Sequence, residues 1–185
     1  MTGKRTHIEK ILRDCICLFL TGAAIGWLYE VLLHVVTDGT FVNRGILHGP
    51  WLPIYGTGCL LIIGLKKWMG HRPLSFFAVS VAACGVIEYV TSWLMEMIYH
   101  TRWWDYSDCL FNLNGRIFVG GLLGFGAAGC LFAYGLFPIL QKQYQKVPTA
   151  WRRKISILLL TIFLADVLLS LFFPNMGTGI TKNYF

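Results

Sequence analysis

"CICLFLTGAAIGWLYEVLLHVVT", residues 15–37, carries a single charged side chain, Glu30, in an otherwise apolar run. About 20 mostly apolar residues in a helix are enough to cross the hydrocarbon core of a bilayer, which is about 30 Å thick. A basic segment precedes the run, as in a secretory signal peptide, but the run is too long and lacks a small-residue cleavage site after a short apolar core. It therefore predicts a membrane-spanning helix.

Four more apolar runs follow, at residues 51–66, 74–99, 117–140 and 155–173. Hydrophobic residues make up 56% of the 185-residue chain and charged residues 14%, whereas soluble domains average about 25% charged residues. The mean hydropathy is +0.59. The sequence therefore predicts one all-α integral membrane domain over residues 1–185, with five transmembrane helices in a lipid bilayer. This length leaves no room for an attached nucleotide-binding unit.

The net charge of +7 lies in short blocks between the apolar runs, which is how membrane helices are oriented, so nucleic acid is not predicted as a partner. Twelve of the 16 Lys and Arg residues fall on alternate sides, before the first run, between the second and third, and between the fourth and fifth. Cytoplasmic segments are the ones enriched in Lys and Arg. The N-terminus is therefore predicted to be cytoplasmic and the C-terminus extracytoplasmic.

The segment before the second span is expected to be irregular or re-entrant. It reads "NRGILHGPWLPIYGTG" (residues 43–58), and its prolines place the start of a regular helix near Pro53. From there to Lys67 a helix rises only about 22 Å, which is less than the hydrocarbon core. The preceding backbone is thus expected to fold back into the membrane, where irregular backbone must be buried in protein or line a wet cavity.

Short similarities within the chain predict an internal repeat. "GWLYEV" (26–31) is similar to "GVIEYV" (85–90), and "FVNRGILHG" (41–49) is similar to "FNLNGRIFVGG" (111–121). The repeat would form two helical hairpins of the same orientation, followed by a fifth helix. The G-x-x-x-G spacings at 22–26 and 120–124 predict close helix packing.

Polar residues gather at the predicted extracytoplasmic side. Four of the nine acids lie inside predicted spans, where a carboxylate costs at least ~2.5 kcal/mol and usually faces a bundle interior or a pathway. The loop "RWWDYSDCLFNLNGR" (102–116) is dense in aromatic and ionic residues; its rings suit the membrane interface, but its Asp, Asn and Arg call for another explanation. The predicted pocket between helices 1–4 consists of Glu30, Asn43, Arg44, Tyr55, Glu88, Glu96, Trp104, Asp105, Tyr106, Asn112, Asn114 and Arg116. This set forms either a closed structural network or a site with an arginine for an anionic ligand.

No metal and no cofactor are predicted. His34, His48 and His100 show no metal-ligand spacing, and the six Cys contain no C-x-x-C pair. The cysteines are expected to be small apolar packing residues.

Several motifs occur in the order found in a family of small bacterial membrane proteins. These are "GWLYE", "FVNRGILHGPWLPIYGTG", "EYVTSWLMEMIY", "RWWDYSDCLFNLNGRI" and "GGLLGFG". Over roughly residues 15–140 the chain resembles the CmpB-like family of putative ABC-transporter permeases. The resemblance implies transport, a location in the bacterial inner membrane and a separate ATPase subunit. The chain departs from ordinary permease domains in being smaller and in showing no cytoplasmic coupling helix.

Three functions remain open at this stage. The first is a small permease-like or transport-associated protein with an outward-facing pocket for a small-molecule or lipid ligand. The alternative is a membrane enzyme that acts on a lipid or prenyl substrate, with the acids, Arg and Asn supplying acid/base chemistry and anion binding. The third is an accessory membrane protein in which the polar residues form a structural network. A homo-oligomer is compatible with each of them.

The predicted topology can be tested by cysteine labelling in a background without the native cysteines. A membrane-impermeant thiol reagent should label a Cys placed at Asn183 but not one at Lys142, because twelve basic residues mark the Lys142 side as cytoplasmic. The reverse labelling pattern would overturn the topology.

Overall fold

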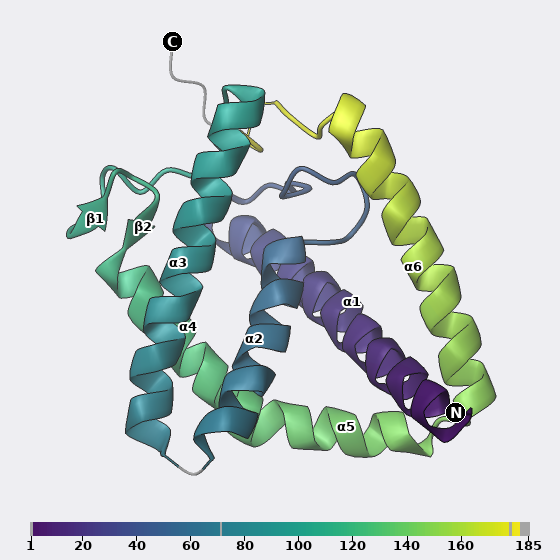
Figure 1. The fold of residues 1–185 in the computed structure, drawn as a ribbon. Helices are drawn as coiled ribbons and strands as arrows, with labels where there is room; N and C mark the ends of the chain where they lie inside the picture. The colour runs from purple at the N-terminus through teal and green to yellow at the C-terminus, as the bar shows by residue number, and fades with distance from the viewer. Residues whose placement is uncertain (1, 71, 178, 182–185) are drawn as a thin grey trace. The chain divides into compact units, whose positions relative to one another are not determined.

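The structure, a computed structural model, describes residues 2–70, 72–177 and 179–181, with side chains from residue 7 onward. Its elements are α1 (Thr2–Asp38), α2 (Pro53–Met69), α3 (Pro73–Tyr99), β1 (Asn112–Leu113), β2 (Ile117–Phe118), α4 (Val119–Leu131), the π-helical turn η1 (Phe132–Leu136), α5 (Phe137–Lys146) and α6 (Thr149–Phe172) (Figure 1). The end of the predicted extracytoplasmic C-terminus, residues 182–185, lies outside the described residues.

Within the described residues, four stretches of helix are long and apolar enough to cross a membrane: His7–Asp38, Pro73–Tyr99, Val119–Lys146 and Thr149–Phe172. The prediction of an all-α multi-pass membrane protein is therefore confirmed. α2 has 17 residues and rises about 25 Å, which is shorter than the hydrocarbon core. A fifth crossing by α2, and re-entry by the segment before it, stay predictions.

The helix ends differ from the predicted spans. α1 begins at Thr2 rather than at residue 15, and α6 begins at Thr149 rather than at residue 155. Hydropathy detects the apolar core of a span but not the polar turns through which a helix continues into the interface. Prolines mark several true starts, because Pro suits the first helical turn: α2 begins at Pro53, α3 at Pro73, and Pro148 precedes α6. Gly70, with φ of +65°, ends α2 in the left-handed conformation.

The described chain divides into two compact units. Unit 1 comprises Met1–Leu60 and Lys142–Asn175, and unit 2 comprises Leu61–Gln141 and Met176–Phe185.

In unit 1, α1 and α6 start at the same end and run in the same direction (Figure 1). The irregular segment 39–52 packs between them towards their other ends. Leu47 and Trp51 are buried there with Leu20 and Ala23 of α1 and Phe163 of α6. The glycine packing predicted at residues 22–26 is found, because a Cβ at Gly22 would overlap Cys59 and one at Gly26 would overlap Tyr55.

Side chains from the end of unit 1 satisfy the backbone of this irregular segment. The carboxylate of Asp166, on α6, accepts hydrogen bonds from the His48 N–H (3.1 Å) and the Gly49 N–H (2.8 Å). The Asn175 amide nitrogen lies 2.8 Å from the Asn43 carbonyl and 3.0 Å from the Gly45 carbonyl. Segment 43–49 is therefore held by specific acceptors and donors rather than standing free as a loop.

In unit 2, α3 and α4 form an antiparallel pair (Figure 1). Small residues bring them together, because a Cβ at Gly126 would overlap Phe77 and Val81, and one at Gly85 would overlap Leu122. The prediction that Gly124 is the packing position is wrong: a Cβ there would meet nothing within 4 Å. The contact lies further along α4 than the G-x-x-x-G spacing indicated. The short hairpin β1–β2, which the sequence analysis did not predict, pairs Asn112 with Phe118 and Leu113 with Ile117.

The π-helical turn η1 lies within the predicted fourth span and has a local cause. Pro138 has no N–H to donate back into the helix, and the Phe137 N–H bonds to the Phe132 carbonyl, five residues back. The Ala133 carbonyl instead accepts a hydrogen bond from the Lys66 ammonium group, which also lies 4.8 Å from the centre of the Tyr134 ring. A basic side chain of α2 thus meets the carbonyl that the wider turn leaves open.

Replacing Asp166 tests the anchoring of the irregular segment. Asp166→Ala should lower the free energy of unfolding by about 1–3 kcal/mol for each N–H left without an acceptor, whereas Asp166→Asn, which keeps one oxygen, should cost less. Asp38→Ala, at the exposed end of α1, is the matched control. Unfolding in mixed micelles, followed by circular dichroism, gives the comparison; equal effects of Asp166→Ala and Asp38→Ala would contradict the anchoring role.

Candidate functional site

The predicted site residues of unit 1 surround Glu30, near the end of α1. Together with Trp27, which was not in the predicted set, they form the Glu30 cluster (Glu30, Asn43, Arg44, Tyr55 and Trp27). The Tyr55 hydroxyl, in the first turn of α2, donates a 2.6 Å hydrogen bond to the Glu30 carboxylate. The Arg44 Nε lies 3.9 Å from the other carboxylate oxygen. Gly26 makes the first contact possible, because any larger residue there would displace the Tyr55 ring.

Asn43 positions the backbone next to Arg44. Its side-chain oxygen accepts a 2.6 Å hydrogen bond from the Trp27 indole N–H, and its amide nitrogen donates to the His48 carbonyl at 2.8 Å. α1 therefore holds both Glu30 and, through Trp27, the loop that carries the arginine. The sequence analysis listed Asn43 but did not identify Trp27 as its partner.

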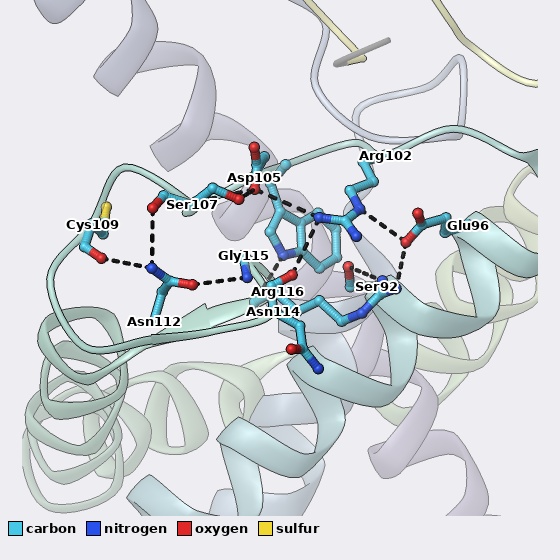
Figure 2. Close-up of polar contacts among 11 residues, drawn as sticks. Ser92, Glu96, Arg102, Asp105, Ser107, Cys109, Asn112, Asn114, Gly115 and Arg116 are labelled. Carbon is cyan, nitrogen blue, oxygen red and sulfur yellow. Dashed lines mark hydrogen bonds and ion pairs between the residues drawn. The ribbon is translucent and has the colours of Figure 1, made fainter. Parts of the chain in front are cut away.

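In unit 2, the Glu96 cluster (Glu96, Arg102, Asp105 and Arg116) lies at the end of α3 (Figure 2). The Glu96 carboxylate lies 2.5 Å from Arg116 Nη2 and 2.9 Å from Arg102 Nε. Asp105 lies 3.7 Å from Arg102 Nη1. The Glu96 carboxylate thus lies between two guanidinium groups, and the Asp105 carboxylate lies next to the guanidinium group of Arg102. Such charge-assisted pairs are stronger than neutral hydrogen bonds.

Arg116 is the most enclosed of these cations. It is 8% exposed. Its Nη1 donates to the Ser92 hydroxyl, one turn before Glu96 on α3, at 3.1 Å, and its guanidinium carbon lies 5.7 Å from the centre of the Tyr89 ring. Its backbone carbonyl accepts a 3.0 Å hydrogen bond from the Trp104 indole. Arg116 is therefore bound on several sides by α3 and by the loop before β1.

The polar residues of loop 102–116 mainly build the loop itself (Figure 2). Asp105 accepts hydrogen bonds from the Ser107 N–H (3.0 Å) and hydroxyl (2.6 Å). Asn112 donates to the Ser107 and Cys109 carbonyls and accepts from the Gly115 N–H at 3.0 Å. Gly115 has φ of +66°, and a Cβ there would overlap Asp105. These bonds fix the backbone from which Arg116 extends.

Two further predicted residues contact α3 from this loop. The Tyr106 hydroxyl donates a 3.2 Å hydrogen bond to the carboxylate of Glu88, which is 5% exposed. The Asn114 amide donates to the Tyr89 hydroxyl at 2.8 Å, while its carbonyl accepts from Arg102. The loop is therefore attached to α3 at successive turns, from Glu88 to Glu96.

The twelve predicted residues thus divide between the two units, with four in unit 1 and eight in unit 2. The expectation that all twelve line one pocket between helices 1–4 stays a prediction. The predicted site left out Arg102, Ser92 and Tyr89. Arg102 could have been included from the sequence, because it lies in the same loop as Asp105 and shortly after Glu96. Among the described residues, no group of three His, Cys, Asp or Glu side chains is placed to hold a metal ion.

The two clusters share a sequence pattern that the predicted repeat did not use. W-L-x-E-x-x-x-H occurs at 27–34 and again at 93–100. Each glutamate pairs with the arginine of a similar downstream motif, N-R-G-I (43–46) or N-G-R-I (114–117). The predicted alignment placed Tyr89 opposite Glu30, whereas the ion pairs give Glu96 the corresponding role.

Comparison with known proteins gives one family. A family model described as "Putative ABC-transporter type IV" matches residues 17–171. Neither a curated protein nor a solved structure matches the chain.

Removing Arg116 tests whether the Glu96 cluster is a buried ionic network. Arg116→Ala should lower the free energy of unfolding by about 3–5 kcal/mol, the usual cost of leaving one member of a buried pair alone. The double variant Glu96→Ala/Arg116→Ala should lose less than the sum of the single losses, because the stranded charge is gone. Lys154→Ala, which has no ion pair among the described residues, is the control. If Arg116→Ala changed neither stability nor function, the cluster would be only an interfacial anchor.

Proposed function

We propose, starting from the fact that the chain belongs to the family described as Putative ABC-transporter type IV, that it is the membrane-embedded, permease-like subunit of a transport system. The Glu30 cluster and the Glu96 cluster would each face the extracytoplasmic side. The bilayer would be the bacterial inner membrane, with the N-terminus in the cytoplasm. The observation that carries the proposal is the arginine-paired glutamate near the end of an apolar helix in each unit.

Ion-paired acids in apolar helices usually mark pathways or bundle interiors. In the Glu30 cluster the Arg44 guanidinium stands at 3.9 Å from its carboxylate, which is a looser pair than the 2.5 Å contact of Arg116 with Glu96. A ligand carboxylate or phosphate could compete for Arg44 because arginine binds such groups through the same donors. The ligand class that fits is therefore a small molecule or lipid with an anionic group.

Energy for transport would come from a separate ATPase subunit. The sequence contains no G-x-x-x-x-G-K-[ST] motif, which would cradle nucleotide phosphates. The chain would act as the membrane half of a complex, and formation of a homo-oligomer is compatible with this role.

The alternative, a membrane enzyme acting on a lipid or prenyl substrate, requires an acid or base that can exchange a proton with the substrate. In the Glu96 cluster the carboxylates serve as counter-ions for two arginines, which favours binding over catalysis. A chemically altered lipid after incubation with the purified protein would favour the enzyme.

Crosslinking in the native host followed by native mass spectrometry in mild detergent tests the transport proposal. Wild-type protein should carry a bound anionic compound and a crosslinked subunit with a nucleotide-binding motif, and the purified complex should hydrolyse ATP. Arg44→Gln should lose the bound compound by about tenfold while keeping the subunit, because one charge-assisted contact is worth about 1.5–3 kcal/mol.

Lys67→Gln, a basic residue at the opposite end of α2, is the matched control and should keep both. Absence of an ATPase subunit together with unchanged ligand in Arg44→Gln would contradict the proposal.

A further inference from the structure

A second region of interest in unit 1 lies between α1 and α6, outside the Glu30 cluster. An apolar groove of about 500 Å³ is lined by Leu20, Ala24, Trp51, Tyr144, Arg152 and Leu159, among others. Its volume is in the range of small-molecule sites, about 300–1,000 Å³. Its walls are mostly apolar, and Thr21, Tyr144, Arg152 and Ser156 are among the polar side chains that line it.

A basic hollow of about 700 Å³ adjoins the groove where α1 and α6 begin. Arg152 and Ser156 border both spaces. The hollow is also lined by Lys10 and Arg13 of α1 and by Arg153 of α6, against a single acid, Glu9. The apolar groove thus lies next to the basic hollow, and Arg152 borders both.

Arg152 is held in place without a carboxylate partner. Its Nη2 donates to the Thr149 hydroxyl at 3.2 Å, and its guanidinium carbon lies 4.9 Å from the centre of the Tyr144 ring. Within the described part of the chain it forms no ion pair, and its Nε is buried without a hydrogen-bond partner. The Nε of Arg13, which lines the same hollow, is likewise buried without a partner. Buried donors without acceptors are uncommon and point to an absent acceptor.

The surrounding charge is positive. Residues 141–154 contain Lys142, Lys146, Arg152, Arg153 and Lys154 and no acid. The nearby Asp14 is already engaged, by Arg13 at 3.4 Å and by the Tyr144 hydroxyl at 2.9 Å. An occupant of the hollow would therefore meet a field that favours anions.

We propose that this region binds one anionic phospholipid, with an acyl chain in the apolar groove and the phosphate group beside Arg152 in the basic hollow. The phosphate oxygens supply the acceptors that the Nε atoms of Arg152 and Arg13 lack. The apolar walls accept a hydrocarbon chain, which a free anion does not offer. Basic segments next to membrane helices attract anionic lipids for the same electrostatic reason.

The test measures lipid retention by native mass spectrometry of the full chain in mild detergent. Phosphatidylglycerol, phosphatidylcholine and inorganic phosphate are added separately. Phosphatidylglycerol should bind at least about tenfold more tightly than phosphatidylcholine, and inorganic phosphate should not compete with it at equal concentration. Arg152→Gln should reduce phosphatidylglycerol binding by about tenfold, the effect of one lost charge-assisted contact.

Two pairs of variants locate the site. Lys154→Gln removes an adjacent charge that lines neither space and should weaken binding far less than Arg152→Gln does, while Arg152→Lys should retain most of the binding. Ala24→Phe fills the groove and should weaken binding, whereas Leu28→Phe, exposed on the same helix, should not. Melting curves of all variants confirm folding. If Arg152→Gln does not fold, lipid binding is measured with Arg152→Lys and Ala24→Phe in its place.

Three outcomes would overturn the proposal. They are equal binding of the two lipids, equal weakening by Arg152→Gln and Lys154→Gln, and displacement of the lipid by inorganic phosphate alone.

Discussion

The backbone of residues 41–52 sets the main constraint on unit 1. The N–H and carbonyl groups of a non-helical segment that are buried between helices must find hydrogen-bond partners within the protein. The Asp166 carboxylate accepts hydrogen bonds from the N–H groups of His48 and Gly49, and the Asn175 amide donates hydrogen bonds to the carbonyls of residues 43 and 45. The Leu52 N–H bonds to the carbonyl of Ala23, in the middle of α1. These bonds fix the position of Arg44, so the geometry around Glu30 depends on the far end of the chain.

In unit 2, the polar backbone groups of loop 102–116 find their partners by a different route. Its loop 102–116 supplies its own partners through Asp105, Asn112 and the left-handed Gly115, and it then binds α3 through Arg116 and Tyr106. A buried ion pair is weak support for stability, because taking both charges out of water costs about as much as their attraction returns. Such a pair instead determines geometry. With Glu96 fixed on α3, few other conformations of the loop would give the Arg116 guanidinium group a carboxylate partner.

The sequence analysis predicted the features that follow from one property along the chain, either hydropathy or charge. Apolar runs marked four of the spans, and the positions of acids and arginines marked most of both clusters. It did not identify Asn175 as the partner of segment 43–49, because nothing in the residues around it distinguishes an anchoring amide from a loop asparagine. The turn η1 needed Pro138 and Lys66 to be considered together, although 72 positions separate them in the chain. The repeat was aligned on the glycines at 26 and 85, whereas the shared contacts follow Trp27 and Trp93.

The differences between the two clusters bear on which of them could exchange a ligand. Both join a glutamate of an apolar helix to an arginine of the following loop, but the Glu96 carboxylate has two guanidinium groups within 3 Å, whereas Glu30 has the Tyr55 hydroxyl at 2.6 Å and Arg44 at 3.9 Å. The electrostatic attraction falls with distance, so the pair of Glu30 with Arg44 is by itself weaker than the pair of Glu96 with Arg116. Arg116 also contacts Ser92 and Tyr89, so an anion that approached its guanidinium group would have to replace all three contacts together.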